Sequence, residues 1–346
     1  MSRCLSILLH REGDDGPWST FQLRVGTPPQ VVRVMASTAS PVTWVILEDA
    51  CPGGDTTSCA AARGLVFSPN ASTTWQNQGL SNLAVESNLN YTGNGQYGLD
   101  TIGLGLTSAQ GISLDGQVVA GIVDQDFQYG ILGLNNQPTN FSNFNNPMSS
   151  YFQSMKDKNL IPSLTWSYTA GNQYSLKKVL GSLVFGGYDA SRFTPNSMSF
   201  PFAVDSSRDL VVAVQSISLT ENNGKTTELL NTGILAFVDS TIPYLYLPLE
   251  VCQRFENAFG LIWDPVAELY LISQSLHSSL VARNLNFTFT LGNQPSGGKS
   301  IQIILPYAAF DLTVTSPIVN SSQIYFPLKR GNSTQYTLGR AFLQEA

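Results

Sequence analysis

The sequence predicts an all-β chain folded as two similar lobes. Short apolar runs alternate with segments rich in Gly, Pro and Asn, a pattern typical of strands joined by turns. Twice, an apolar run ends in a cluster rich in small hydroxyl residues, at 37–40 and at 239–241. A short apolar run closed by glycine follows each cluster. Gly133 lies 96 residues after position 37, and Gly339 lies 100 residues after position 239. Two such similar spacings indicate an internal duplication.

The strands of the first lobe are predicted to be short. Residues 21–25 alternate between apolar and polar side chains, a Gly-Thr-Pro-Pro turn follows, and residues 31–35 form an apolar run. Residues 42–46 and 118–123 predict two further strands. Residues 88–98 are rich in Asn, Gly and Tyr, which indicates the tip of a hairpin.

Two helices are predicted between the strands. Asn146 can cap the first, and Pro147 suits its first turn. Pro248 begins the second, and Gly260 ends it. The apolar stripes are Tyr151, Phe152 and Met155 in the first helix and Val251, Phe255 and Phe259 in the second. We expect the lobes to span residues 17–190 and 191–346.

Composition excludes several classes of function. The chain has 346 residues, enough for a large core, with 42% apolar and only 12% charged residues. Its net charge of −6 argues against nucleic acid, which requires a basic face. No apolar stretch reaches the roughly 18 residues of a membrane-spanning helix. The two histidines, His10 and His277, are far apart in sequence, which argues against a His-based metal site. We therefore expect no metal and no cofactor.

Several short motifs follow one another in a characteristic order. They are Gly26-Thr27-Pro28-Pro29-Gln30, Trp44, the pair Cys51 and Cys59, Ser72-Thr73-Thr74-Trp75, Asp100-Thr101, Gly130-Ile131-Leu132-Gly133-Leu134, Phe185-Gly186-Gly187 and Leu338-Gly339. In this order and spacing the chain resembles the pepsin-type aspartic peptidases, from about residue 21 to its last residue. The resemblance implies a two-lobed pepsin-like double-barrel fold with one catalytic motif per lobe. It also implies that Phe185-Gly186-Gly187 lies in strands that join the lobes.

The catalytic motif of the first lobe departs from this family. Ser37 stands where the resemblance places the first catalytic Asp, and Asp239 matches the second. Hydrolysis by such an enzyme uses two carboxylates that share one proton, one acting as base and one as acid. A serine hydroxyl cannot replace the carboxylate base. We therefore predict that Asp239 is vestigial, ionised and hydrogen-bonded by neighbouring amides and hydroxyls.

The residues beside these positions are partly kept. Thr38 and Ser240 match the hydroxyl pair that the family places between its lobes, whereas Ala39 and Thr241 replace glycines. Asp239 could also be a capped turn carboxylate that reads no ligand. A nucleophilic Ser37 would need a base and an oxyanion hole, and no histidine is near it in sequence.

The resemblance also implies a hairpin that closes over the cleft and carries a tyrosine. The candidates are Tyr91 and Tyr97, and we choose Tyr91 because it lies farther from the predicted strand. The alternative is that both tyrosines pack on the sheet.

Cysteines and sequons favour the secretory pathway. The resemblance implies a disulfide between Cys51 and Cys59, whereas Cys4 and Cys252 are free or lack their partners. Six Asn-x-Ser/Thr sequons are candidate glycosylation sites: Asn70, Asn90, Asn140, Asn286, Asn320 and Asn332. We expect an extracellular or cell-surface protein whose leader is absent from this chain and whose second lobe is cut short.

These observations lead to three hypotheses about function. The first is a non-catalytic relative of the peptidases, a monomer that binds an extended peptide or a protein in the cleft between its lobes. The second is a weak aspartic-type endopeptidase that uses Asp239. The third is a structural cell-surface glycoprotein.

Overall fold

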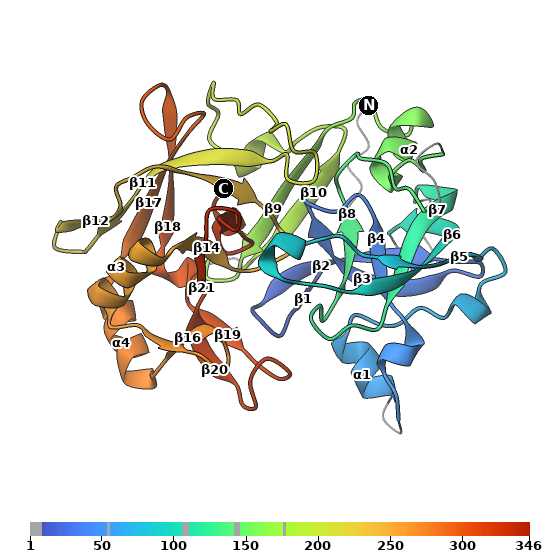
Figure 1. Cartoon of the computed structure of the whole chain (residues 1–346), viewed down its shortest axis with the longest axis horizontal. Helices are drawn as coiled ribbons and strands as arrows, with labels where there is room; N and C mark the ends of the chain where they lie inside the picture. The colour runs from blue at the N-terminus through green and yellow to red at the C-terminus, as the bar shows by residue number, and fades with distance from the viewer. Residues whose placement is uncertain (1–8, 54–55, 106–110, 142–145, 176–177) are drawn as a thin grey trace. The chain divides into compact units, whose positions relative to one another are not determined.

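The computed structural model describes most of the chain (Figure 1). The described residues are 9–53, 56–105, 111–141, 146–175 and 178–346. Cys4 lies outside them. The chain divides into two compact units. Residues 18–168 and 182–189 make up most of the first unit, and residues 12–17, 169–181 and 190–346 form the second.

The first unit is built on one eight-stranded sheet. In spatial order its strands are β1 (Leu9–Glu12), β2 (Trp18–Val25), β3 (Gln30–Ser37), β8 (Gly130–Gly133), β4 (Thr43–Ile46), β7 (Ser113–Ile122), β6 (Asn94–Leu104) and β5 (Gln76–Asn82). β2 also pairs with β6, so the strands from β2 to β6 close into a ring. The strands expected at 21–25, 31–35, 42–46 and 118–123 correspond to β2, β3, β4 and β7 of this sheet. β2 begins three residues and β7 five residues before the predicted start, and β3 ends two residues after its predicted end.

Both faces of this sheet are buried. Along β4, Val45 packs into one apolar cluster while its neighbours Trp44 and Ile46 pack into another. Alternate side chains of a strand point to opposite faces, so the two clusters lie on opposite sides of the sheet. This arrangement explains why the central strands are continuous apolar runs and do not alternate with polar residues.

The second unit contains a second large sheet and a smaller one. The order of the large sheet is β18 (Ser300–Pro306), β17 (Asn286–Gly292), β11 (Val211–Thr220), β13 (Ile234–Val238), β22 (Thr337–Leu338), β14 (Leu245–Pro248) and β21 (Leu328–Gly331), with β12 (Thr226–Leu230) paired to β11. The smaller sheet has the order β15 (Ile262–Asp264), β16 (Leu269–Ile272), β20 (Gln323–Phe326) and β19 (Leu312–Val314).

The two large sheets share one topology at their centres. In the first, β3 and β8 are parallel, β8 and β4 are antiparallel, and β4 and β7 are parallel. In the second, β13 and β22 are parallel, β22 and β14 are antiparallel, and β14 and β21 are parallel. The same four-strand arrangement thus occurs twice, as the duplicated spacings predict. The expectation of a mostly β, two-lobed pepsin-like fold is confirmed.

Four α-helices occur among the described residues: α1 (Thr56–Ala62), α2 (Tyr151–Asp157), α3 (Leu249–Phe259) and α4 (Gln274–Arg283). The prediction for α3 is confirmed, with Pro248 before its first residue and Gly260 in the left-handed conformation after its last. The predicted start of α2 at Asn146 is wrong. Ser150 caps this helix, and Met148 is held extended by a pair of 2.8 Å hydrogen bonds with Thr139.

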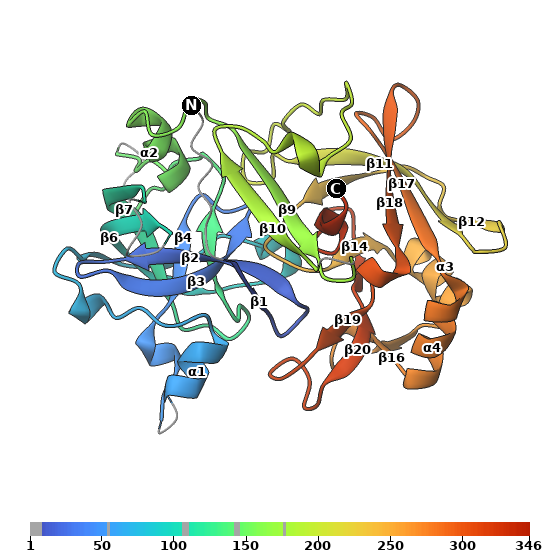
Figure 2. The ribbon, with the colours of Figure 1, turned by 180° about the vertical axis from the view of Figure 1, so that it is seen from behind.

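Neither α1 nor α4 is predicted from the sequence. α1 begins in the loop between the paired cysteines, after the Pro-Gly-Gly-Asp stretch that predicts only turns, and it continues past Cys59. Ser273 caps α4. α4 lies beside α3 in Figure 2, and Arg283 of α4 donates to the carbonyl of Ala258 in α3 at 3.1 Å. The phenylalanines of α3 pack against Phe287 of β17 and Phe326 of β20.

The chain also forms a two-stranded sheet that is separate in its strand pairing from the two large sheets. It pairs β9 (Trp166–Asn172) with β10 (Val179–Phe185). Each strand belongs partly to the first unit and partly to the second, because the division falls after Tyr168 and after Gly181. Phe185, from the motif expected in strands joining the lobes, is the last residue of β10.

Candidate active site

Asp239 follows β13 directly, at the centre of the second unit's sheet. Its N–H donates to the carbonyl of Leu338 in β22 at 3.1 Å. Gly339 is required just beyond, since a Cβ there would lie 2.4 Å from the carbonyl oxygen of Tyr244 and 2.6 Å from that of Ile242. The Leu-Gly run therefore ends in glycine because the loop after Asp239 packs directly on its backbone.

The carboxylate of Asp239 is completely buried. Its Oδ1 accepts a hydrogen bond from the N–H of Thr241 at 2.8 Å. Its Oδ2 is also buried and has no hydrogen-bond partner among the residues that the structure describes. Burying such an oxygen without a donor costs free energy. Oδ2 is therefore a buried acceptor whose donor is not supplied by the described residues.

Ser37 ends β3, the strand that corresponds to β13. Its side chain is completely buried, and its Oγ accepts a hydrogen bond from the N–H of Ser40 at 3.0 Å. Its carbonyl accepts from the N–H of Leu134 at 2.9 Å. Gly133 is packed as tightly as its counterpart in the second unit, since a Cβ there would lie 2.6 Å from the carbonyl oxygen of Ser40. Through these contacts Ser37 stabilises the turn that follows β3. Its hydroxyl, unlike the carboxyl group of an aspartate, carries no negative charge.

The neighbours of both residues are buried as well. In the first unit these are Thr38 and Ala39, and in the second Ser240 and Thr241. Small or hydroxyl side chains at these positions fit a crowded interior. Their roles as cleft residues remain predictions.

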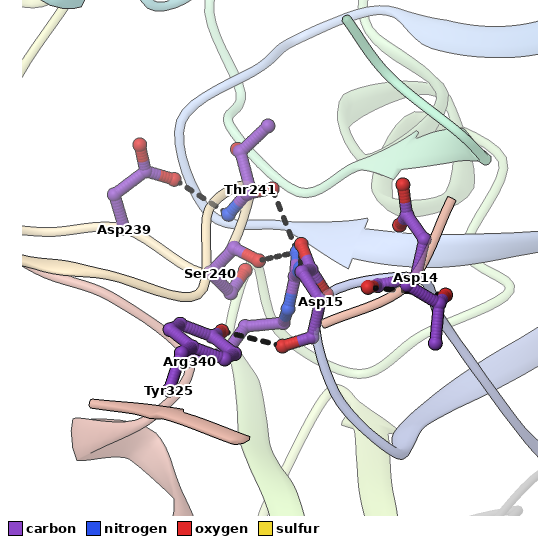
Figure 3. A network of polar contacts seen from close by, with 8 residues as sticks. Asp14, Asp15, Asp239, Ser240, Thr241, Tyr325 and Arg340 are labelled. Carbon is purple, nitrogen blue, oxygen red and sulfur yellow. Dashed lines mark hydrogen bonds and ion pairs between the residues drawn. The ribbon is translucent and has the colours of Figure 1, made fainter. Parts of the chain in front are cut away.

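A buried ion pair contacts the loop that follows Asp239 (Figure 3). Arg340 follows Gly339, and its Nη2 lies 2.9 and 3.2 Å from the two carboxylate oxygens of Asp15. Its Nη1 donates to the carbonyls of Ser240 at 3.1 Å and Thr241 at 2.7 Å. The sequence reading missed this pair. An arginine directly after the Leu-Gly motif and an Asp-Asp pair near the N-terminus were the available signals.

The segment that carries Asp15 belongs to the second unit, although β2 after it belongs to the first. The backbone of this segment is held in place by two hydrogen bonds. The carbonyl of Asp14 accepts from the N–H of Thr315 at 2.8 Å, and the carbonyl of Asp15 accepts from the hydroxyl of Tyr325 at 2.5 Å. Burial raises the pKa of Tyr325 well above its ordinary value, so this hydroxyl stays a donor.

The two candidate tyrosines have different surroundings. Tyr97 lies on β6, is buried, and donates its hydroxyl to the carbonyl of Asn82 at 3.2 Å. Burial raises its pKa to about 12. Tyr91 lies in the loop between β5 and β6, half-buried, with its ring 5.2 Å from that of Phe127, which in turn packs 5.2 Å from Trp44. Tyr97 is thus a core residue, and Tyr91 stays the predicted cleft tyrosine.

The predicted disulfide between Cys51 and Cys59 is confirmed. Cys252 is a free, buried thiol on α3, and burial raises its pKa to about 12. Five sequon asparagines are exposed: Asn70, Asn90, Asn140, Asn320 and Asn332. Asn286 is half-buried at the start of β17. Their glycosylation remains a prediction.

The duplicated four-strand arrangement, with a buried strand-end loop in each unit, defines a pepsin-like protein. The chain belongs to the eukaryotic aspartyl protease family, whose family model matches residues 20–346.

Among its relatives, candidapepsin-2 of Candida parapsilosis is 26% identical over 306 residues, covering 87% of this chain and 66% of the relative. Secreted aspartic protease 5 of Candida albicans is 25% identical over 271 residues, or 73% of this chain and 59% of the relative. A probable aspartic-type endopeptidase OPSB of Arthroderma benhamiae is 26% identical over 288 residues, or 78% and 53%. The matches thus span two thirds or less of these relatives' own lengths. In the described part of this chain, no helix is long and apolar enough to cross a membrane.

Proposed function

We propose that this chain is a non-catalytic member of the aspartyl protease family that binds an extended peptide or a protein segment at Asp239. The observation that carries this proposal is the difference between the two strand-end loops. One loop begins at Asp239, which carries a buried carboxylate. The other begins at Ser37, whose hydroxyl accepts a backbone N–H. The family chemistry needs two carboxylates that share a proton, and a single one cannot act as base and acid together.

Binding is the property that this arrangement keeps. The unpartnered Oδ2 of Asp239 can accept a hydrogen bond from a peptide N–H or a hydroxyl. A hydrogen bond to a buried charged acceptor is stronger than one between neutral groups. The ligand therefore gains affinity at this point even though no bond is broken.

The compartment follows from the disulfide and the relatives. We infer that the protein passes through the secretory pathway, because Cys51 and Cys59 are bonded and a relative is named as a secreted protease. We expect it to act as a monomer, extracellularly or at the cell surface.

The test is a pair of assays on the full chain with fluorescein-labelled oxidised insulin B chain. We expect no cleavage above background at any acid pH, because general acid-base help worth roughly 10²–10⁴-fold per positioned group is missing. Fluorescence anisotropy should show saturable binding, and Asp239→Ala should weaken it. Asp264→Ala removes a half-buried carboxylate at the end of β15 that accepts the N–H of Val266, and this matched control should bind as the parent does.

The second candidate is a weak peptidase that uses Asp239 alone, favoured by the burial of this carboxylate in its loop. It would be supported by cleavage at acid pH that Asp239→Asn abolishes, and that result would overturn the non-catalytic proposal. A chain that neither cleaves nor binds the peptide would instead favour a structural glycoprotein.

A further inference from the structure

Arg340 and Asp239 are connected through a single peptide group. The carbonyl of Ser240 accepts a hydrogen bond from Nη1 of Arg340 at 3.1 Å. The N–H of the same peptide group, which belongs to Thr241, donates to Oδ1 of Asp239 at 2.8 Å (Figure 3). A guanidinium, a peptide group and a carboxylate thus form one continuous chain of hydrogen bonds.

We propose that Arg340 is a positioning residue that strengthens the hydrogen bond from the Thr241 amide to Asp239 by polarising the Ser240–Thr241 peptide group, and that Asp15 moderates this effect. A positive charge on the carbonyl side of a peptide group draws electron density from its N–H, which becomes a stronger donor. The stronger donor makes a stronger hydrogen bond to Oδ1 of Asp239, which fixes the orientation of that side chain.

Burial makes this hydrogen bond important. Asp239 is completely buried, so bulk water does not compete for its hydrogen bonds. Oδ1 receives its hydrogen bond from Thr241, while Oδ2 has no partner among the described residues. The positive charge of Arg340, whose side chain is only 4% exposed, is screened little by water and acts over this short path.

Asp15 has the opposite influence. Both of its oxygens lie within 3.2 Å of Nη2 of Arg340, and its side chain is 14% exposed. Its negative charge compensates part of the guanidinium charge and so weakens the polarisation of the peptide group. The two members of one ion pair therefore act on Asp239 in opposite directions.

This opposition separates the proposal from a purely structural role. If the ion pair only fastened the N-terminal segment to the loop, removing either member would loosen the same contact. Both changes would then move the Thr241 amide in the same direction. Electrostatic polarisation predicts that they move it in opposite directions.

The amide proton of Thr241 reports the strength of its hydrogen bond directly. The full chain is labelled with ¹⁵N-threonine, and the signal is assigned by its loss in Thr241→Ser. We expect an upfield shift of the Thr241 proton in Arg340→Met and a downfield shift in Asp15→Asn. Asp14→Asn removes the negative charge next to Asp15 in sequence, whereas the carboxylate of Asp15 itself lies 2.9 Å from Nη2 of Arg340, so Asp14→Asn should shift the signal less than Asp15→Asn does.

Arg340→Lys keeps a positive charge in a smaller group and serves if Arg340→Met fails to fold. Its Thr241 signal should lie upfield of the parent signal. If Arg340→Met folds, the Arg340→Lys signal should lie between those of the parent and Arg340→Met. Shifts in the same direction for the Arg340 and Asp15 variants, or no shift for either, would overturn the proposal.

The use of Asp239 as an acceptor for peptide donors rests on the proposed function. The polarisation of the Ser240–Thr241 peptide group by Arg340 does not depend on it. Opposite shifts without binding of the labelled insulin B chain would sustain the role of Arg340 and remove the proposed function. Binding of the labelled insulin B chain, together with Thr241 shifts in the same direction for the Arg340 and Asp15 variants, would sustain the proposed function and remove the role of Arg340.

Discussion

Asp239 and Ser37 end equivalent strands of the two sheets, and each side chain accepts an N–H from the loop that follows it. The acceptors differ in charge. A carboxylate buried without a second donor needs a ligand group or a charge elsewhere to stabilise it, whereas a hydroxyl needs neither. The hydroxyl of Ser37 accepts an N–H from its own loop, whereas Asp239 keeps one carboxylate oxygen without a donor among the described residues.

Introducing a carboxylate at position 37 tests this difference. We expect Ser37→Asp alone to give little peptidase activity, because Ala39 and Thr241 add side chains in buried positions where the family resemblance places glycines. Ser37→Asp with Ala39→Gly and Thr241→Gly should give measurable cleavage of a fluorogenic peptide at acid pH.

The control for this rescue is Asp239→Asn in the triple variant, which should return the rate to background because a dyad needs both carboxylates. Strong activity from Ser37→Asp by itself would contradict the argument from crowding.

At the scale of elements, α1 depends on the disulfide. It has only seven residues, and isolated helices of that length are unstable in water. Cys59 lies on this helix and is bonded to Cys51, which follows a short 3-10 turn. Arg63, just after the helix, donates to the carbonyls of Ala50 and Phe127. The helix is thus held by contacts with residues outside its own sequence.

Removing the disulfide should destabilise this region. The bond joins residues 8 apart in sequence, and closing so short a loop stabilises by about 2–3 kcal/mol in the chain-entropy model. We expect Cys51→Ser with Cys59→Ser to lower the free energy of unfolding by that amount and to increase hydrogen exchange in residues 56–65. A reductant should destabilise the parent but not the double variant, since Cys252 is unpaired. Equal sensitivity of both proteins would contradict the prediction.

At the scale of the whole molecule, buried tyrosines occur in both units. Burial raises the pKa of Tyr97 to about 12, and it also raises the pKa of Tyr151 and of Tyr325. A group whose pKa is higher in the folded state stabilises the fold below its unfolded pKa, and this contribution is lost as pH rises through the folded value.

The protein should therefore lose stability as the pH rises from about 10, the value for an exposed tyrosine, toward 12, the value for folded Tyr97. Urea denaturation at a series of alkaline pH values measures this loss. Tyr97→Phe should reduce its steepness because one ionisable hydroxyl is removed, whereas Tyr188→Phe, at an exposed position, should leave it unchanged. An equal slope in the parent and Tyr97→Phe would show that this tyrosine does not contribute.

Sequence alone determined the duplicated plan of this protein. The repeated spacings, the apolar runs and the glycines after them are local features, and each reflects a backbone constraint that acts wherever the chain goes. Gly133 and Gly339 could be identified as paired landmarks because a side chain at either position would collide with the opposing backbone. The serine at position 37, where the family resemblance places an aspartate, was likewise read directly from the sequence.

Only the tertiary structure decided how the remaining charged residues are used. Asp15 and Arg340 lie 325 residues apart, and no local pattern relates them. Their pairing follows from residues 12–17 belonging to the second unit. The start of α2 was misjudged for a similar reason, because a pairing between Met148 and Thr139 overrides the local preference of Asn146 and Pro147. Long-range contacts of this kind depend on the assembled fold, since many distant pairs are chemically compatible but the backbone brings only a few of them together.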